Sequence, residues 1–355
     1  MRILHTSDIH LDSPLTTHLS SDKVRERKRE LVATFQHTVD RALMMNATGY
    51  IIAGDLFDTE KVTKSTIENL MAIIARVPQL TFFYLFGNHE KRMLIESGVE
   101  IPKNLKIFDD GWTYFRIDDV TIAGRCETAK DMFSTLTLDP GKRNIVVLHG
   151  ELCDRSDAGG AIGVKEIEGL PIDYLALGHY HTYGATSIGT RCTAVYSGVP
   201  EGRGFDEVGE KGVVMLDVDK FGIRHEFIKT AKRTLRIIEA NVSEAKRGVD
   251  VEEAAARAIY GIERCDLVRL LLVGERELTT ALDTDALYDR FKDRFYYFEV
   301  KDATRVRISA DDFKNDRSLK GEFIRSVLAD EGLSDQMKER VITTGLRALI
   351  GESID

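Results

Sequence analysis

Side chains that can bind metal ions follow five apolar segments of this sequence, each near the point where the segment ends. The segments are 3–4, 51–53, 82–86, 145–148 and 174–177. The residues that follow them are Asp8, His10, Asp55, Asn88, His89, His149, His179 and His181. Five of the nine histidines lie at these positions. Carboxylate, amide and imidazole donors suit Mn²⁺, Fe²⁺, Zn²⁺ or Ni²⁺, so the pattern indicates a metal site.

Each of these residues has an ordinary explanation when it is taken alone. Aspartate after glycine, as in Gly54-Asp55, is common in turns, and a single histidine such as His149 is more often a core or surface residue. Only His179-Tyr180-His181 is suggestive by itself. The combination favours a metal site because the carboxyl ends of strands converge in layered α/β sheets. A carboxylate can bridge two cations and two cations can clamp a phosphoryl group, so we expect Asp55 to bridge two metal ions.

The elements that must position these residues alternate between strand and helix from residue 2 to residue 230. A helix is expected at 22–46, because Leu31, Phe35, Val39 and Leu43 recur at four-residue spacing. A second helix is expected near 63–76, and a hairpin across Asp118-Asp119. Strands are expected at 2–6, 50–53, 80–86, 145–148, 174–177, 191–196, 212–217 and 223–228. This alternation predicts an α/β or α+β layered domain.

The sequence changes character after about residue 230. Residues 231–305 predict a small α/β module, with strands at 235–242, 267–273 and 295–300 and helices at 251–262 and 283–292. Residues 306–355 predict helices, with Ser334 as an N-cap. An apolar stripe at helical spacing follows, formed by Met337, Val341, Ile342, Leu346, Leu349 and Ile350. Packing of this stripe within its own domain is favoured over binding to a partner.

Composition and charge exclude several classes of protein. The 355 residues carry a net charge of −9, which weighs against a basic nucleic-acid coat protein. The four cysteines are scattered without a CxxC, so reduced thiols are expected rather than a zinc ribbon. No apolar run approaches membrane-spanning length, and the opening Met1-Arg2-Ile3 has no signal-peptide pattern. A cytoplasmic protein without a membrane contact is expected.

The order DxH, GDxxD, GNHE, H, GHxH resembles the calcineurin-like metallophosphoesterases, and within them the SbcD-type DNA double-strand-break repair nucleases. The stretches that carry the resemblance are 4–11, 54–59, 173–181, 196–200 and 205–207. The strong resemblance covers residues 1–217. It implies an α/β (α+β layered) two-sheet sandwich flanked by helices over 1–230, a smaller α/β cap domain over 231–305 and a C-terminal helical segment over 306–355.

The resemblance also implies a role for each motif residue. Asp8, His10 and His181 bind one metal, Asn88, His149 and His179 bind the other, and Asp55 bridges them. A hydroxide held by the two metals attacks the phosphorus of a phosphodiester. His89 stabilises the transition state or protonates the leaving oxygen, and Asp58 positions His89 or a metal ligand.

Cofactors and partners follow from the same resemblance. Two divalent ions are expected, Mn²⁺ first, with Fe²⁺, Zn²⁺ or Ni²⁺ as alternatives. The partners are DNA and an SbcC-like coiled-coil ATPase, which the C-terminal helices would contact, with a homodimer inside a heterotetramer at the nucleoid. Arg203, Arg25 and Lys28 are candidate DNA contacts; for the last two, a solvated helix face is an equally good explanation.

One departure and two rivals stand beside this expectation. Glu90 occupies a place where SbcD-type nucleases usually carry aspartate. Protein phosphatases of the superfamily share that glutamate, but they follow GDxxD with an arginine, and here Thr59-Glu60 follow Asp58. The rivals are a phosphoesterase acting on nucleotides, small phosphodiesters or phosphoproteins, and a metal-binding scaffold without activity.

Overall fold

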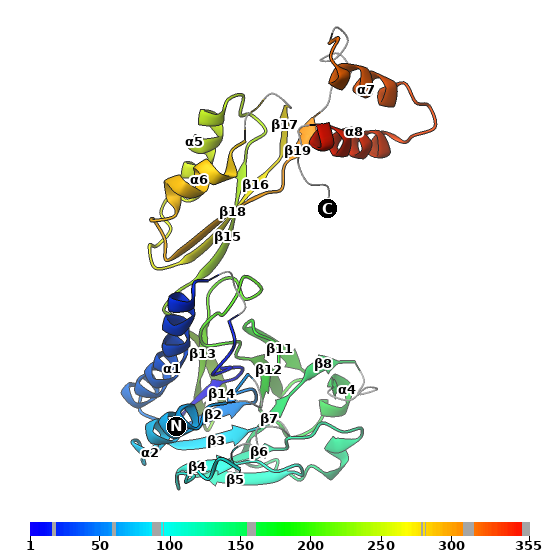
Figure 1. Ribbon diagram of the computed structural model, residues 1–355. Coiled ribbons are helices and arrows are strands. Elements are labelled where there is room, and N and C mark those ends of the chain that lie inside the picture. Colours follow the sequence, from blue (N-terminus) through cyan, green and yellow to red (C-terminus); the bar gives the residue numbers. More distant parts are fainter. Residues whose placement is uncertain are drawn as a thin grey trace. The chain divides into compact units, whose positions relative to one another are not determined.

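The computed structural model describes residues 1–15, 19–58, 62–86, 94, 96–154, 161–277, 280, 282–307 and 316–349 (Figure 1). The chain divides into two compact units, Met1–Leu235 and Arg236–Asp355. The division expected from the sequence lay after residue 230. No described helix is long and apolar enough to span a membrane.

The first unit contains two six-stranded sheets. The first sheet has the order β14-β13-β1-β2-β3-β4, with β1 to β4 parallel and β13 antiparallel to β1. These strands are β14 (Gly222–Lys229), β13 (Gly212–Asp219), β1 (Arg2–Thr6), β2 (Ala47–Ala53), β3 (Thr81–Leu85) and β4 (Leu105–Ile107). Two helices, α1 (Ser21–Met44) and α2 (Lys64–Ala75), pack on one face of this sheet (Figure 1).

The second sheet has the order β11-β12-β10-β7-β6-β5. Its inner strands β12, β10, β7 and β6 are parallel, and the edge strands β11 and β5 are antiparallel to their neighbours. The strands are β11 (Gly184–Ile188), β12 (Cys192–Tyr196), β10 (Tyr174–Gly178), β7 (Arg143–His149), β6 (Val120–Gly124) and β5 (Thr113–Ile117). The outer face is covered by η1 (Met132–Thr135) and α4 (Val164–Ile167), and β8 (Glu151–Cys153) pairs with β9 (Ala161–Gly163) beside them.

Alternation along the strands explains why the sheets stack. Successive strand side chains point to opposite faces. On β1, Ile3 enters the core between the sheets while Leu4 packs toward the helices, and on β2 the same holds for Ile51 and Ile52. Strands that are apolar on both faces are expected in the middle of a layered fold. The predicted α/β layered, two-sheet sandwich is therefore confirmed.

The second unit contains a small α/β module and two further helices. Its sheet has the order β15-β16-β18 (Leu235–Asn241, Leu267–Val273 and Tyr297–Asp302), and α5 (Gly248–Ala258) and α6 (Thr284–Phe291) share a core with it. A short pair, β17 (Glu275–Glu277) and β19 (Arg305–Arg307), is parallel. Helices α7 (Leu319–Leu328) and α8 (Asp335–Leu349) pack together through Ile324, Ile342 and Leu346. The inner part of the predicted apolar stripe thus packs within its own unit, as favoured.

Candidate metal centre

The candidate centre lies where four central strands end, two from each sheet. β1 and β2 lead into Asp8 and Asp55, and β7 and β10 lead into His149 and His179. The sheets meet at this edge, since Nδ1 of His149 lies 3.0 Å from the carbonyl oxygen of Ala53 on β2. The carboxyl ends of the parallel strands therefore converge as predicted.

The ligand loops have an uncommon backbone conformation. Asp8, His10 and Asp55 have φ values of 51°, 49° and 47°, and His179 has a φ of 106°. Positive φ outside glycine costs on the order of 1 kcal/mol or more per residue and persists only where the surroundings enforce it. Here the N–H of Asp8 donates to the Gly54 carbonyl at 3.1 Å, and the N–H of His10 donates to the Asp55 carbonyl at 3.0 Å. These bonds hold the two loops side by side.

Two glycines leave room for the imidazole of His149. A Cβ on Gly54 would lie 2.2 Å from His149 Nδ1, and a Cβ on Gly178 would lie 2.7 Å from the same atom and 1.9 Å from the Ala53 carbonyl oxygen. Gly54 also has a φ of +92°. The glycine of the Gly-Asp motif is therefore required by the histidine of another strand as well as by its own backbone.

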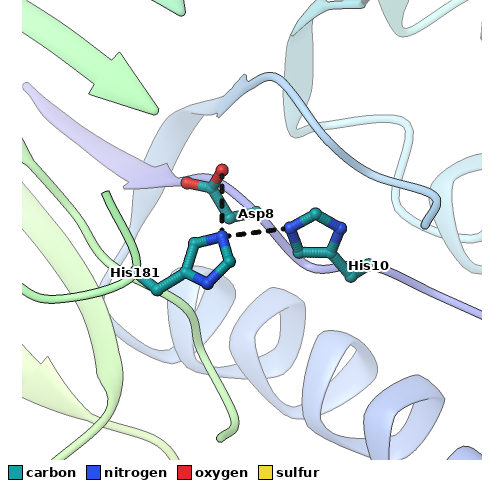
Figure 2. Close-up of side chains that lie close together, drawn as sticks. All are labelled: Asp8, His10 and His181. Carbon is teal, nitrogen blue, oxygen red and sulfur yellow. Dashed lines mark hydrogen bonds and ion pairs between the residues drawn. The ribbon is translucent and has the colours of Figure 1, made fainter. Parts of the chain in front are cut away.

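Asp8, His10 and His181 form the first group of donors (Figure 2). The Nε2 atoms of the two histidines lie 3.3 Å apart, and His181 Nε2 lies 4.0 Å from Asp8 Oδ1. Figure 2 shows the three side chains pointing toward one another from the loops after β1 and β10. Two donors bound to one ion at about 2.1 Å can be at most about 4.2 Å apart, so His181 is close enough to share an ion with His10 and with Asp8.

Asp8, Asp55 and His149 form the second group. Asp55 Oδ2 lies 3.6 Å from His149 Nε2 and 3.9 Å from His10 Nε2. The same carboxylate oxygen is thus within one-ion reach of a histidine from each group. This is the position that the predicted bridging role requires.

Two histidines of these donor groups are oriented by hydrogen bonds at Nδ1, the ring nitrogen that faces away from the other donors. The Ala53 carbonyl can only accept, so His149 Nδ1 is the donor of this bond, and Nε2 is the ring nitrogen that faces the Asp55 carboxylate. His181 Nδ1 lies 2.8 Å from Glu207 Oε1, which directs its Nε2 toward His10 in the same way. With their outer nitrogens held by these partners, both rings present Nε2 to the other donors, and the residues therefore fit the metals that the sequence implies.

Burial favours the uncharged form of two donors. Asp8 is fully buried, and burial raises the pKa of its carboxyl group although both oxygens accept the N–H of His179, at 3.0 and 3.1 Å. Burial, reinforced by the positive charge of Arg203, lowers the pKa of His10 to about 3. A histidine must be neutral to bind a metal, and His10 is held in that form.

Three further side chains lie behind the first group. Arg203 donates from Nη1 to Asp58 Oδ1 at 2.6 Å and from Nη2 to Glu207 Oε1 at 2.7 Å. Asp58 Oδ1 lies 3.2 Å from His10 Nδ1. Burial alone would raise the pKa of Glu207, but hydrogen bonds with His181 and Arg203 outweigh it and lower that pKa to about 2. Both carboxylates therefore face the outer nitrogens of metal-ligand histidines.

The structure brings together Asp8, His10, Asp55, His149 and His181. The His179 side chain lies outside both groups, and its ring packs against His149 with 5.6 Å between centroids. Asn88, His89 and Glu90 lie outside the described residues. The predicted second-metal ligands Asn88 and His179, and the catalytic role of His89, stay predictions.

The three candidate DNA contacts differ in how they are held. Arg203 is directed inward at two carboxylates, and its side chain is 14% exposed. Arg25 forms an exposed ion pair with Asp22, and Lys28 donates to the Asp12 carbonyl at 3.4 Å. Their contact with DNA stays a prediction.

Glu207 is the residue of this site to which the sequence assigned no role. It stood in the stretch 205–207 that supports the resemblance, but its contact with His181 joins two loops. The available signal was a glutamate four residues after an arginine, and its burial and its ion pair with Arg203 come from the structure.

Comparison with known proteins agrees with this geometry. The model of the calcineurin-like phosphoesterase family matches residues 1–183. The chain is 24% identical over 263 residues to an uncharacterized metallophosphoesterase, YhaO, of Bacillus subtilis, covering 69% of this chain and 64% of that one. It is 24% identical over 262 residues to the DNA double-strand break repair protein Mre11 of Methanosarcina mazei, covering 68% of this chain and 40% of that one. The chain thus spans less than two thirds of the length of either relative.

Among solved structures, TT1561 of Thermus thermophilus matches with a TM-score of 0.43 at 12% identity, covering 64% of this chain and 98% of that one. The family match extends over half of the chain and includes every metal-ligand motif from Asp8 to His181. This protein belongs to the calcineurin-like phosphoesterase family.

Proposed function

We propose that this protein is a metal-dependent DNA nuclease of the SbcD type, which hydrolyses phosphodiester bonds at a site for two divalent ions. The observation that carries the proposal is the pair of donor groups, with Asp55 Oδ2 lying between His10 and His149. Two divalent ions bound there would polarise a phosphoryl group, lower the pKa of water and offset the charge of the transition state. Manganese is the ion we expect first.

The chain's own residues prepare the site for this chemistry. Asp8 and Asp55 supply the negative charge that holds cations, and buried, neutral His10 supplies a lone pair. The Ala53 carbonyl and the Glu207 carboxylate fix the rings of His149 and His181, so that little rearrangement is needed on binding. His89 would then give a proton to the leaving oxygen.

Support for DNA as the substrate comes from the relatives. Two of them, from Methanosarcina mazei and Methanosarcina acetivorans, are named DNA double-strand break repair protein Mre11. Phosphodiesters of nucleotides or other small molecules are the alternative. The inward direction of Arg203 favours that alternative, because this arginine is then not available to a DNA backbone.

We also propose an SbcC-like coiled-coil ATPase as the partner of a dimer of this chain. The supporting feature is α8, where Met337 is 48% exposed while Ile342 and Leu346 are buried against α7. Met337→Asp should abolish copurification with the coexpressed ATPase without changing cleavage by the isolated subunit. Copurification of this variant at the wild-type level would contradict the proposed contact.

The test of the activity compares three substrates on metal-free protein reloaded with Mn²⁺. These are end-labelled linear duplex DNA, bis-p-nitrophenyl phosphate and p-nitrophenyl phosphate. We expect cleavage of DNA and of the diester, lost in Asp55→Asn and kept in Asp119→Asn. The exposed Asp119 carboxylate pairs with Lys142, which precedes the start of β7, whereas His149 ends that strand. Activity confined to the monoester would refute the nuclease, and cleavage of the small diester alone would support the alternative.

A further inference from the structure

We propose that Arg203 is a positioning residue that sets the metal affinity of the first donor group by holding Asp58 against His10 and Glu207 against His181. The inference rests on the proposed metal-dependent function and gives Arg203 a different task from the DNA contact expected from the sequence. The Arg203 guanidinium pairs with both carboxylates, and through them it connects two histidine ligands that come from the loops after β1 and β10.

On the Glu207 side, the contacts with both His181 and Arg203 are formed. Glu207 Oε1 lies 2.8 Å from His181 Nδ1 and accepts from Arg203 Nε and Nη2 at 3.1 and 2.7 Å. Its Oε2 accepts the backbone N–H of Arg203 at 2.7 Å. The carboxylate has a side-chain exposure of 1%. Arg203 and His181 are therefore the hydrogen-bonding partners of this buried charge.

On the Asp58 side, the hydrogen bond to Arg203 is formed but the one to His10 is not. Arg203 Nη1 donates to Asp58 Oδ1 at 2.6 Å, and this same oxygen lies 3.2 Å from His10 Nδ1. That nitrogen is buried and forms no completed hydrogen bond with the described residues. A small rotation of the imidazole would bring the Nδ1–H onto Asp58, and a metal ion that draws Nε2 into line would favour that rotation.

Only an arginine suits this position. Its planar fork directs Nε and Nη2 to one carboxylate and Nη1 to the other, while a lysine offers a single nitrogen. Without the guanidinium, two carboxylates would lie behind the same two histidines with no cation between them. Their repulsion would turn them, and the imidazole rings with them, away from the shared point where the Nε2 atoms lie 3.3 Å apart.

The loop that carries Arg203 is itself anchored. Glu201 is buried and accepts hydrogen bonds from Arg27 at 3.0 Å, from Thr34 at 3.1 Å and from the backbone N–H of Lys232 at 2.6 Å. The backbone N–H of Glu207 donates to the Gly204 carbonyl at 2.9 Å and closes the turn between the two functional side chains. The guanidinium therefore projects from a fixed base.

Calorimetric titration of Mn²⁺ into the metal-free full chain tests the proposal. We expect Arg203→Gln to weaken one of two Mn²⁺ sites by about 10–100-fold, the usual effect of removing an outer partner of a ligand, and to leave the other within about twofold. Arg191→Gln is the matched control, since Arg191 joins Asp173 to the carbonyls of Pro140 and Lys142 away from the site. It should leave both affinities unchanged, and both metal-free variants should have similar Tm values.

A second variant covers the case in which Arg203→Gln fails to fold. Glu207→Gln keeps the side-chain volume and an accepting oxygen but removes the charge, and it should weaken the same single site. Histidine ¹⁵N spectra should show the Nδ1–H tautomer of His181 in the wild type and a mixture of tautomers in the variant. Unchanged Mn²⁺ affinity in both variants would overturn the proposal.

The same experiments separate the two tasks considered for Arg203. If it contacts DNA instead, Arg203→Gln will bind duplex DNA more weakly in the presence of EDTA while both Mn²⁺ affinities stay at the wild-type value. If the wild type binds no Mn²⁺ at all, the proposed metal-dependent function fails and the positioning role fails with it. A wild type that binds two ions but cuts no DNA refutes only the nuclease.

Discussion

Substitution of Gly54 by alanine should remove the His149 ligand without altering any metal-binding atom. The new Cβ would lie 2.2 Å from His149 Nδ1, where ordinary contact begins at 3.4 Å. The imidazole must therefore retreat by about 1.2 Å, roughly six times the 0.2 Å tolerance of a metal–ligand distance. The bond from His149 Nδ1 to the Ala53 carbonyl, which fixes the ring, is lost with the same movement.

Gly54→Ala has two effects, backbone strain and the clash with His149, and a substitution at a second glycine measures the strain alone. Gly54 has a φ of +92°, so alanine there is also strained, by about 1 kcal/mol. Gly169 has a φ of +84°, and a Cβ added there would meet no atom within 4 Å. Gly169→Ala should therefore show the strain alone, as a modest fall in Tm with Mn²⁺ binding intact.

Mn²⁺ titration and thermal unfolding in EDTA are the measurements. Gly54→Ala should weaken one Mn²⁺ site by more than about 100-fold, beyond the range for loss of an outer partner, and leave the site formed by His10 and His181 nearly intact. Two sites of wild-type affinity in Gly54→Ala would show that the packing of Gly54 against His149 does not govern metal binding, and the reasoning would be wrong.

Three further predictions concern metal stoichiometry, pH and the C-terminal helices. Asp55→Asn should lower the Mn²⁺ content measured by elemental analysis at both sites, because Asp55 Oδ2 is close to His10 and His149, whereas His149→Ala should lower mainly one. Burial opposes ionisation of Glu30, yet hydrogen bonds from Arg233, Lys232 and Arg27 lower its pKa from 4.5 to about 2. Urea unfolding at pH 7 should therefore show the wild type to be roughly 3 kcal/mol more stable than Glu30→Gln. This difference should disappear as the pH falls from 4.5 toward 2, because the unfolded state takes up its proton first. Ile342→Ala should destabilise α7 and α8 by about 2–4 kcal/mol in hydrogen exchange, with Mn²⁺ binding in the first unit unchanged.

Much of the scaffold could be predicted because its signals are local. The apolar runs 145–148 and 174–177 are buried strands, and the ligands that follow them lie where strand ends converge. β4 and β11 were not predicted. β4 has three residues, and β11 is an edge strand whose residues 185–187 are exposed, so neither presents an apolar run.

The contacts that tune the site could not be read from the sequence, because they join distant segments. Gly54 looks like a turn residue, and only the structure shows that His149 occupies the space beside it. Arg203 looks like a free cation in a glycine-rich loop, but it lies between Asp58 and Glu207. Residue type indicates which interactions a side chain can form. Which of them it does form depends on neighbours from other parts of the chain.

The donors of the centre come from both halves of the sandwich, Asp8, His10 and Asp55 from the first sheet and His149 and His181 from the second. An ion bound here would be a cross-link between layers whose shared core is apolar. By mass action, an ion present at a hundred times its Kd adds about 2.7 kcal/mol to the free energy of unfolding. Metal supply in the cell would then govern how long this chain survives proteolysis. A shortage of metal would lower the amount of the protein as well as its catalytic activity.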